Sequence, residues 1–582
     1  MAVQKTVLLR RFQALLLTGA TALLTACGGS DAAPEGSAGE TAQAAPTARQ
    51  GTATWNGPVA VTSLGEARGI IEEGVETFLG LPYAQPPLGQ LRFAPPVPLV
   101  SWNGPVEATG FGPACPQPAI EPSDIINSRI DEDCLTLNVW TPATDNGQRP
   151  VMFWIHGGGY IWESSGARLY NGARLAARGD VVVVSVEYRL GAMGFSHLQE
   201  EPGSGNAGVL DPVMALRWVQ DHIAAFGGDP NNVTIFGESA GSYSVTSLLG
   251  MPEASGLFHR AIGQSGGSSN VRRADYAAEA TRRLMAHAGV STIAELRALS
   301  WQEIIRAQEA VLDDTRLPEG IYGPVVDGIV FSETPLSAIA RGLSSDVPLL
   351  VGFTRDEGRW WLVEVPILQL PVVTPGIMSL AFPYLGRSIP DGKSIAHANL
   401  VYNWEYPLQA AFPNLQAIAM TQDVMLRIPT LRHAEAQVQH QPGNVFVYRF
   451  DWEPPAPAYP LLDLGSPHGA ELGFTMGNPE GWPEIYGDRG IPTGLRDQIM
   501  DAWVAFARTG NPNHSGIPTW RPYNLSDRPT MLFNERWGRT RSKLDYDPDG
   551  YTRKFWSDRA FDGMDPPFLP EDLSGDALLA LP

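Results

Sequence analysis

The sequence predicts an α/β fold with a large, mostly parallel central sheet and helices on both faces. Apolar runs at residues 151–155, 233–236 and 347–353 have the length and composition of strands buried inside such a sheet. The run at 233–236 leads into a glycine-rich turn and then into a helix-compatible segment. A hydrophobic content of 43% is ample for a sizeable core.

Length and charge are consistent with one large folded unit. The chain has 582 residues and no internal repeat or low-complexity linker divides its body, so we predict a single domain over 53–582. The formal net charge of −21 argues against nucleic acid as a partner, because phosphate binding needs a basic surface. An acidic surface also repels anionic substrates, weakly at physiological salt.

The segment Gly-Glu-Ser-Ala-Gly at 237–241 is the most specific catalytic signal in the chain. Its position after an apolar run predicts a strand, a sharp turn and a helix. Small residues on both sides of Ser239 allow this turn, which lifts the hydroxyl clear of the backbone toward a base. We therefore predict a nucleophile at Ser239, although a glycine-rich turn without a catalytic role also fits these five residues taken alone.

Three glycines at 157–159 follow the predicted strand at 151–155 and His156. Consecutive glycines let backbone N–H groups approach a ligand closely, as an oxyanion hole requires. A flexible turn is the alternative interpretation.

A carboxylate and a histidine that could complete a catalytic triad with Ser239 follow later in the chain. Asp356 and Glu357 come after the predicted strand at 347–353, and His468 lies in a later loop. The chain order of serine, acid and histidine is that of α/β-hydrolases and differs from the order in chymotrypsin-like and subtilisin-like enzymes. Order and context together indicate a triad.

The chain resembles the type B carboxylesterases, the family that includes the cholinesterases and many bacterial esterases. The resemblance covers nearly everything after about residue 53, and its stretches are together more specific than any single motif. They lie at 78–84, 91–93, 132–135, 138–139, 188–191, 226–230, 233–241, 263–266, 324–328, 356–358, 468–469 and 506–512. This family resemblance implies an α/β-hydrolase fold with helical insertions over the active site.

The resemblance also implies a role for each candidate residue. Ser239 would be the nucleophile, His468 the general base and Glu357 the acid that orients it, with Asp356 as the rival acid one position earlier. The implied oxyanion donors are the backbone N–H groups of Gly158, Gly159 and Ala240. The activity implied is serine carboxylesterase hydrolysis through an acyl-enzyme, with no cofactor.

Residues 1–26 have the pattern of an export signal. Basic residues precede an apolar segment that is too short for a stable membrane anchor. The Leu-Thr-Ala-Cys sequence ending at Cys27 resembles the lipidation site of bacterial lipoproteins, and ordinary signal cleavage after Ala22 is the alternative. Residues 27–52 then form a flexible tether. We expect an exported protein, lipid-anchored at the outer membrane or in the periplasm, or otherwise secreted.

Cys115 and Cys134 are the remaining cysteines. In an oxidising compartment they could close a loop of about 20 residues, although two separate buried thiols are also possible; the family resemblance implies the disulfide. The loop between them, 116–133, contains no Trp, Tyr or Phe. Cholinesterases hold their cationic substrate on a tryptophan from this loop, so the resemblance implies neutral esters for this chain; the alternative is that another aromatic residue, such as Trp162 after the glycine run, takes the place of that tryptophan.

The segment 274–312 has a helical pattern and is expected to cover the catalytic face. Thr292 with Glu295, and Ser300 with Glu303, have the spacing of capping boxes.

Two other functions are known for, or compatible with, this scaffold. A lipase acting on long-chain esters would prefer emulsions to soluble esters, whereas a non-catalytic binding protein on this scaffold would lack a triad member, and this chain has all three. The expected partner is a small-molecule ester. The remaining histidines lack ligand spacing, so no metal site is expected, and the sequence does not indicate an oligomeric state.

Overall fold

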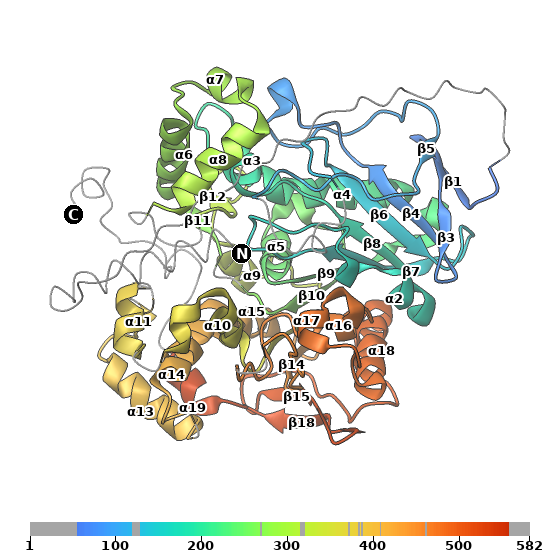
Figure 1. Cartoon of the computed structure of the whole chain (residues 1–582). Helices are drawn as coiled ribbons and strands as arrows, with labels where there is room; N and C mark the ends of the chain where they lie inside the picture. The colour runs from blue at the N-terminus through green and yellow to red at the C-terminus, as the bar shows by residue number, and fades with distance from the viewer. Residues whose placement is uncertain are drawn as a thin grey trace, which may run out of the picture.

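The computed structural model in Figure 1 describes residues 55–557 except 119–128, 268–269, 315–320, 371–372, 382–384, 386–387, 408 and 460–461. The predicted signal peptide (1–26) and tether (27–52), with Cys27, lie outside these residues. The predicted domain is therefore described from Trp55 to Ser557.

An 11-stranded sheet forms the centre of the fold, in the order β18-β15-β14-β13-β10-β9-β7-β8-β6-β4-β3. Its strands are β3 (Ile70–Glu72), β4 (Val75–Pro82), β6 (Thr136–Thr141), β7 (Arg149–Ile155), β8 (Val182–Val186), β9 (Gly228–Glu238), β10 (Arg260–Gln264), β13 (Leu349–Thr354), β14 (Val445–Phe450), β15 (Pro529–Phe533) and β18 (Lys543–Tyr546). Neighbours from β15 to β8 are parallel, and the strands beyond them are antiparallel. The predicted, mostly parallel sheet is confirmed.

The three apolar runs form the expected strands β7, β9 and β13 in the middle of this sheet. Every residue of β13 is buried, as expected for a strand covered on both faces. Strand β9 begins earlier than the apolar run because its residues 229–232 are partly exposed and can therefore be polar.

Helices cover both faces of the sheet, as predicted (Figure 1). The helices in the described residues are α2 (Ala173–Gly179), α3 (Gly191–Phe195), α4 (Ala207–His222), α5 (Ala240–Leu249), α6 (Ala274–Ala288), α7 (Ile293–Ala298), α8 (Trp301–Leu312), α9 (Pro335–Ala340), α10 (Trp361–Glu364), α11 (Pro375–Ala381), α13 (Ile395–Glu405), α14 (Pro413–Gln422), α15 (Ile428–Val438), α16 (Leu472–Thr475), α17 (Pro483–Tyr486), α18 (Thr493–Thr509) and α19 (Gly550–Phe555).

Two consecutive residues of β10 show which helices lie on which face. Gly263 faces α5, since a β-carbon there would lie 2.8 Å from Oγ of Ser242. Gln264 accepts a hydrogen bond of 3.1 Å from Nε1 of Trp503 in α18. Successive side chains in a strand point to opposite faces, so α5 and α18 pack on opposite sides of the sheet.

Helical insertions follow the carboxyl ends of β10 and β13, the sheet edge at which β9 also ends. Helices α6 to α8 lie between β10 and β13, and α10 to α15 lie between β13 and β14. The predicted capping boxes begin α7 and α8, where Thr292 and Ser300 each accept the expected backbone N–H.

Smaller elements complete the fold. Strands β1 (Val59–Thr62), β2 (Gly65–Arg68) and β5 (Val106–Glu107) form a 3-stranded sheet, and two 2-stranded sheets pair β11 (Arg272–Arg273) with β12 (Val325–Val326) and β16 (Glu535–Arg536) with β17 (Arg539–Thr540). Cys115 and Cys134 form a disulfide. Within the described ranges, no helix combines the length and apolar character needed to cross a bilayer.

Candidate active site

Ser239 occupies the single residue between the end of β9 and the start of α5. Its φ of 54° lies in the left-handed region that non-glycine residues avoid. The turn is possible because its neighbours are small: a β-carbon at Gly241 would lie 2.0 Å from the carbonyl oxygen of Ile155. Strand, turn and helix follow one another as the sequence predicts, and the turn holds Ser239 at the carboxyl edge of the sheet.

The glycine run 157–159 follows β7 and passes directly beside this turn. A β-carbon at Gly157 would lie 3.4 Å from Cβ of Ser239. The hydroxyl of Tyr188 donates 2.9 Å to the carbonyl oxygen of His156 and thereby fixes the peptide that enters the run. Gly158 and Gly159 both have positive φ, 87° and 62°. The run is thus a backbone segment held against the predicted nucleophile.

Ala240 is the first residue of α5. An N–H group at this helix position has no intrahelical acceptor. Ala240 thus follows Ser239 directly, and Gly158 and Gly159 follow Gly157, the residue of the glycine run that lies beside the Ser239 turn.

His468 lies in the loop after β14 and contacts Glu357, the first residue of the 3₁₀ helix η7 (Glu357–Trp360). Its Nδ1 is 2.6 Å from Oε2 of Glu357, and its backbone N–H donates 3.3 Å to the Glu357 carbonyl. The other carboxylate oxygen of Glu357 accepts the N–H of Thr354 at 2.8 Å. The acid is fully buried and held from two sides.

Asp356, the rival acid, is engaged elsewhere. Its carboxylate pairs with Arg355 at 2.7 Å and with Arg359 at 3.2 Å. It also accepts the backbone N–H of Ser466 at 3.0 Å. The structure therefore brings Glu357, and not Asp356, to the imidazole.

The other imidazole nitrogen faces a second carboxylate. Nε2 of His468 lies 3.1 Å from Oε1 of Glu238, the residue before Ser239. Among the described residues, no hydrogen bond joins the His468 ring to the Ser239 hydroxyl. Burial alone would lower the pKa of His468, but the carboxylates of Glu238 and Glu357 raise it to about 10. Burial raises the pKa of Glu238 well above its usual range.

Two further acids lie at this site, and neither was predicted. Glu471 follows His468 by one turn and accepts 3.3 Å from Oγ of Ser265; burial raises its pKa to about 7. Glu163 lies in the turn after the glycine run and accepts 2.7 Å from the hydroxyl of Tyr170. Neither glutamate belongs to a sequence motif. The only signals in the sequence are that Glu471 lies close to His468 and that Glu163 lies close to the glycine run. Among the described residues, no cluster of three or more His, Cys, Asp or Glu is arranged to hold a metal ion.

Comparison with known proteins gives one consistent result. Residues 56–547 match the Carboxylesterase family. The para-nitrobenzyl esterase of Bacillus subtilis (strain 168) is 36% identical over 497 residues, which cover 82% of this chain and 94% of that relative. The liver carboxylesterase of Sus scrofa is 35% identical over 529 residues, 83% of this chain and 91% of that relative. A solved carboxylesterase structure from Geobacillus stearothermophilus has a TM-score of 0.74 at 35% identity, covering 86% of this chain and 99% of that one.

Proposed function

The chain belongs to the carboxylesterase family and is a carboxylic ester hydrolase, and from this premise we propose that Ser239, His468 and Glu357 are its catalytic triad. The substrates proposed are neutral esters with short to medium acyl chains or aryl alcohols. Backbone N–H groups of Gly158, Gly159 and Ala240 form the proposed oxyanion hole.

In this mechanism His468 accepts the proton of the Ser239 hydroxyl as its oxygen attacks the ester carbonyl. The oxyanion hole stabilises the negative charge that forms on the carbonyl oxygen. His468 then gives its proton to the departing alcohol, which leaves an acyl-enzyme on Ser239. A water molecule attacks that ester by the same steps and releases the acid. Glu357 holds the imidazole in orientation throughout.

The contact between His468 and Glu357 carries the proposal. A buried carboxylate 2.6 Å from Nδ1 fixes the tautomer of neutral His468 in which Nδ1 carries the proton and Nε2 is the nitrogen that accepts one. Nε2 of His468 contacts Glu238, the residue immediately before Ser239, so the serine turn lies on the Nε2 side of the imidazole. The glycine run lies against this turn.

Covalent labelling tests the nucleophile directly. A fluorophosphonate should inactivate the enzyme and add its phosphonyl group to the peptide that contains Ser239, as measured by mass spectrometry. Hydrolysis of para-nitrophenyl butyrate should be lost in proportion to the label. Labelling of another residue, or full activity in a stoichiometrically labelled enzyme, would reject Ser239.

We also propose that the chain is exported and carries a lipid on Cys27. The support is the Leu-Thr-Ala-Cys sequence after an apolar segment, at the start of the predicted tether 27–52. Cys27→Ala should release the protein from the membrane fraction or block its processing. Mass spectrometry of the mature N-terminus decides the question, since an unmodified chain that begins at Leu23 would contradict lipidation.

A further inference from the structure

Glu163 has a backbone conformation that ordinarily belongs to glycine. Its φ is 87°, in the left-handed region where a β-carbon meets the backbone. Residues held in such conformations persist where the surrounding structure enforces them, and they cluster at functional sites. The contacts of Glu163 therefore identify what enforces this conformation.

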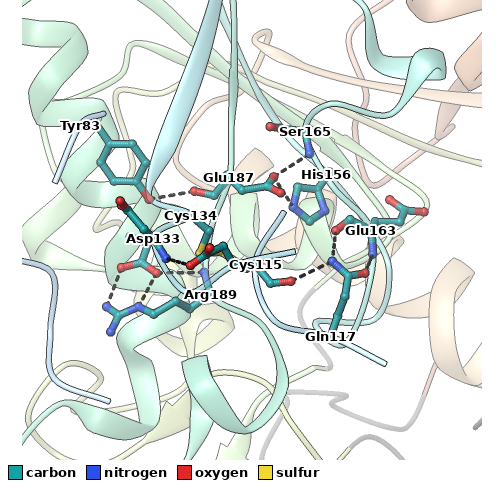
Figure 2. The surroundings of a disulfide bond; sticks show 12 residues. Tyr83, Cys115, Gln117, Asp133, Cys134, His156, Glu163, Ser165, Glu187 and Arg189 are labelled. Atoms are coloured by element: carbon teal, nitrogen blue, oxygen red, sulfur yellow. Dashed lines mark hydrogen bonds and ion pairs between the residues drawn. A yellow bond between two sulfur atoms is a disulfide. The ribbon is translucent and has the colours of Figure 1, made fainter. Parts of the chain in front are cut away.

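Gln117 clamps the backbone of Glu163 from both sides (Figure 2). Its Nε2 donates 2.9 Å to the carbonyl oxygen of Glu163, and its Oε1 accepts the N–H of Glu163 at 2.9 Å. The same amide donates 3.1 Å to the carbonyl oxygen of Cys115, one half of the disulfide. The backbone of Glu163 is thus fixed to the disulfide-closed loop by two hydrogen bonds with the Gln117 side chain.

The glycine run lies between Glu163 and the catalytic serine. A β-carbon at Gly158 would lie 3.1 Å from Cβ of Glu163, whereas one at the adjacent Gly157 would lie 3.4 Å from Cβ of Ser239. The Glu163 side chain is therefore within a few ångströms of the proposed oxyanion hole. Its carboxylate is fixed by the hydroxyl of Tyr170 at 2.7 Å.

The charged side chains near this carboxylate are a histidine and an acid. Among the described residues, no Lys or Arg forms an ion pair with Glu163. Of the charged side chains near it, His468 lowers the pKa of Glu163, and Glu163 in turn raises the pKa of Glu238. Burial outweighs the hydrogen bonds from the Tyr170 hydroxyl and the Gly157 backbone and the charge of His468, and it raises the pKa of Glu163 to about 7. Above that pH Glu163 carries a partly buried negative charge whose cationic neighbour, in the described part of the chain, is the imidazole of His468 and not a Lys or Arg.

We propose that Glu163 adds a charge preference to the neutral-ester activity proposed above: relative to a neutral ester of the same shape, it disfavours one with an anionic group near the scissile bond and favours one with a primary ammonium there. A primary ammonium can donate hydrogen bonds to the carboxylate, so this preference needs no aromatic platform. A like charge at the same place is repelled in a poorly solvated site. The inference rests on the proposed function, because it places the ester carbonyl beside Ser239.

Three matched substrates test the charge selection. They are the para-nitrophenyl esters of adipic acid as its monoanion, of adipamic acid, which is neutral, and of ε-aminocaproic acid, which is cationic. A second series carries the same three groups on the phenol of a butyrate ester. The measured quantities are the ratios of kcat/KM within each series, so a general loss of activity in a variant cancels.

Glu163→Gln keeps the shape of the side chain and an acceptor for Tyr170 but removes the charge. At about pH 8 the ratio of neutral to anionic substrate should fall by about fivefold or more in at least one series, and the ratio of cationic to neutral substrate should fall as well. Glu163→Gly suits the positive φ and should change the ratios in the same way if the glutamine variant folds poorly. Glu107→Gln, an equal change of charge on β5, is the control and should leave both ratios within about twofold of the wild type.

The pH dependence provides a second readout. Between about pH 8 and pH 6 the substrate carboxylate stays ionised, whereas Glu163 gains a proton, so the wild-type ratio of neutral to anionic substrate should shrink. Glu163→Gln should lack that component, while contributions from His468 and Glu238 remain in both proteins. Ratios that stay unchanged in both series would overturn the inference and leave the triad proposal intact. Undiminished hydrolysis of neutral esters by Ser239→Ala would instead reject the triad.

Discussion

Nε2 of His468 lies 3.1 Å from Oε1 of Glu238, the residue that immediately precedes the proposed nucleophile. This carboxylate stabilises the imidazolium form, whereas a general base must be neutral when substrate arrives. Burial favours the protonated form of Glu238 and thus opposes the charge that would hold the proton on His468. The protonation states of these two side chains are therefore linked, and we expect them together to set the pH at which the enzyme becomes active.

Replacing Glu238 with glutamine should shift the pH dependence of catalysis. The negative charge of Glu238 raises the pKa of His468, so its removal should lower that pKa and move the acidic limb of the kcat/KM profile to lower pH. The measurement is kcat/KM for para-nitrophenyl butyrate across the pH range in wild type, Glu238→Gln and the control Glu107→Gln. An unmoved acidic limb would mean that Glu238 is already protonated where His468 titrates.

Ser239→Ala and His468→Ala should each lower kcat by about a thousandfold or more, because nucleophile and base act as one unit. The double variant should lose little more than either single one. Circular dichroism and thermal unfolding should show that the fold is retained. A double variant whose loss is the product of the two single losses would indicate that the residues do not act together.

Glu357→Gln should lose far more activity than Asp356→Asn. Glu357 contacts Nδ1 of His468 at 2.6 Å, whereas Asp356 pairs with two arginines and Ser466. Glutamine at 357 would no longer stabilise the imidazolium that forms during the reaction. Asp356→Asn should lower the melting temperature, because it breaks a partly buried ion-pair cluster. Its effect on kcat should be small. The reverse ranking of the two kcat values would contradict the acid assignment.

The sequence was sufficient to predict the sheet and the order of the proposed triad, because both depend on local patterns. Apolar runs mark β7, β9 and β13, and small residues mark the turn at Ser239. The choice between Glu357 and Asp356 depended on partners far along the chain, which spacing alone does not reveal.

Glu163 could not be found from the sequence for a different physical reason. A glutamate in a sequence does not predict a positive φ. Gln117, whose side chain holds the Glu163 backbone in this conformation, lies 46 positions away. Only the folded chain brings the disulfide-closed loop to the glycine run and this carboxylate.

Gly158→Ala should impair catalysis through the backbone. At its φ of 87° a β-carbon would lie 1.9 Å from the carbonyl oxygen of Trp162, so the chain must shift and move the N–H groups proposed to stabilise the oxyanion. We expect kcat for para-nitrophenyl butyrate to fall by about a hundredfold, the effect of losing one oxyanion donor. Gly104→Ala is the matched control, because its φ is 95° and a β-carbon there meets nothing within 4 Å. Both variants incur a similar backbone strain of about 1 kcal/mol, so both should unfold at lower temperature, but Gly104→Ala should retain kcat. Wild-type kcat in Gly158→Ala would show that this peptide does not stabilise the oxyanion.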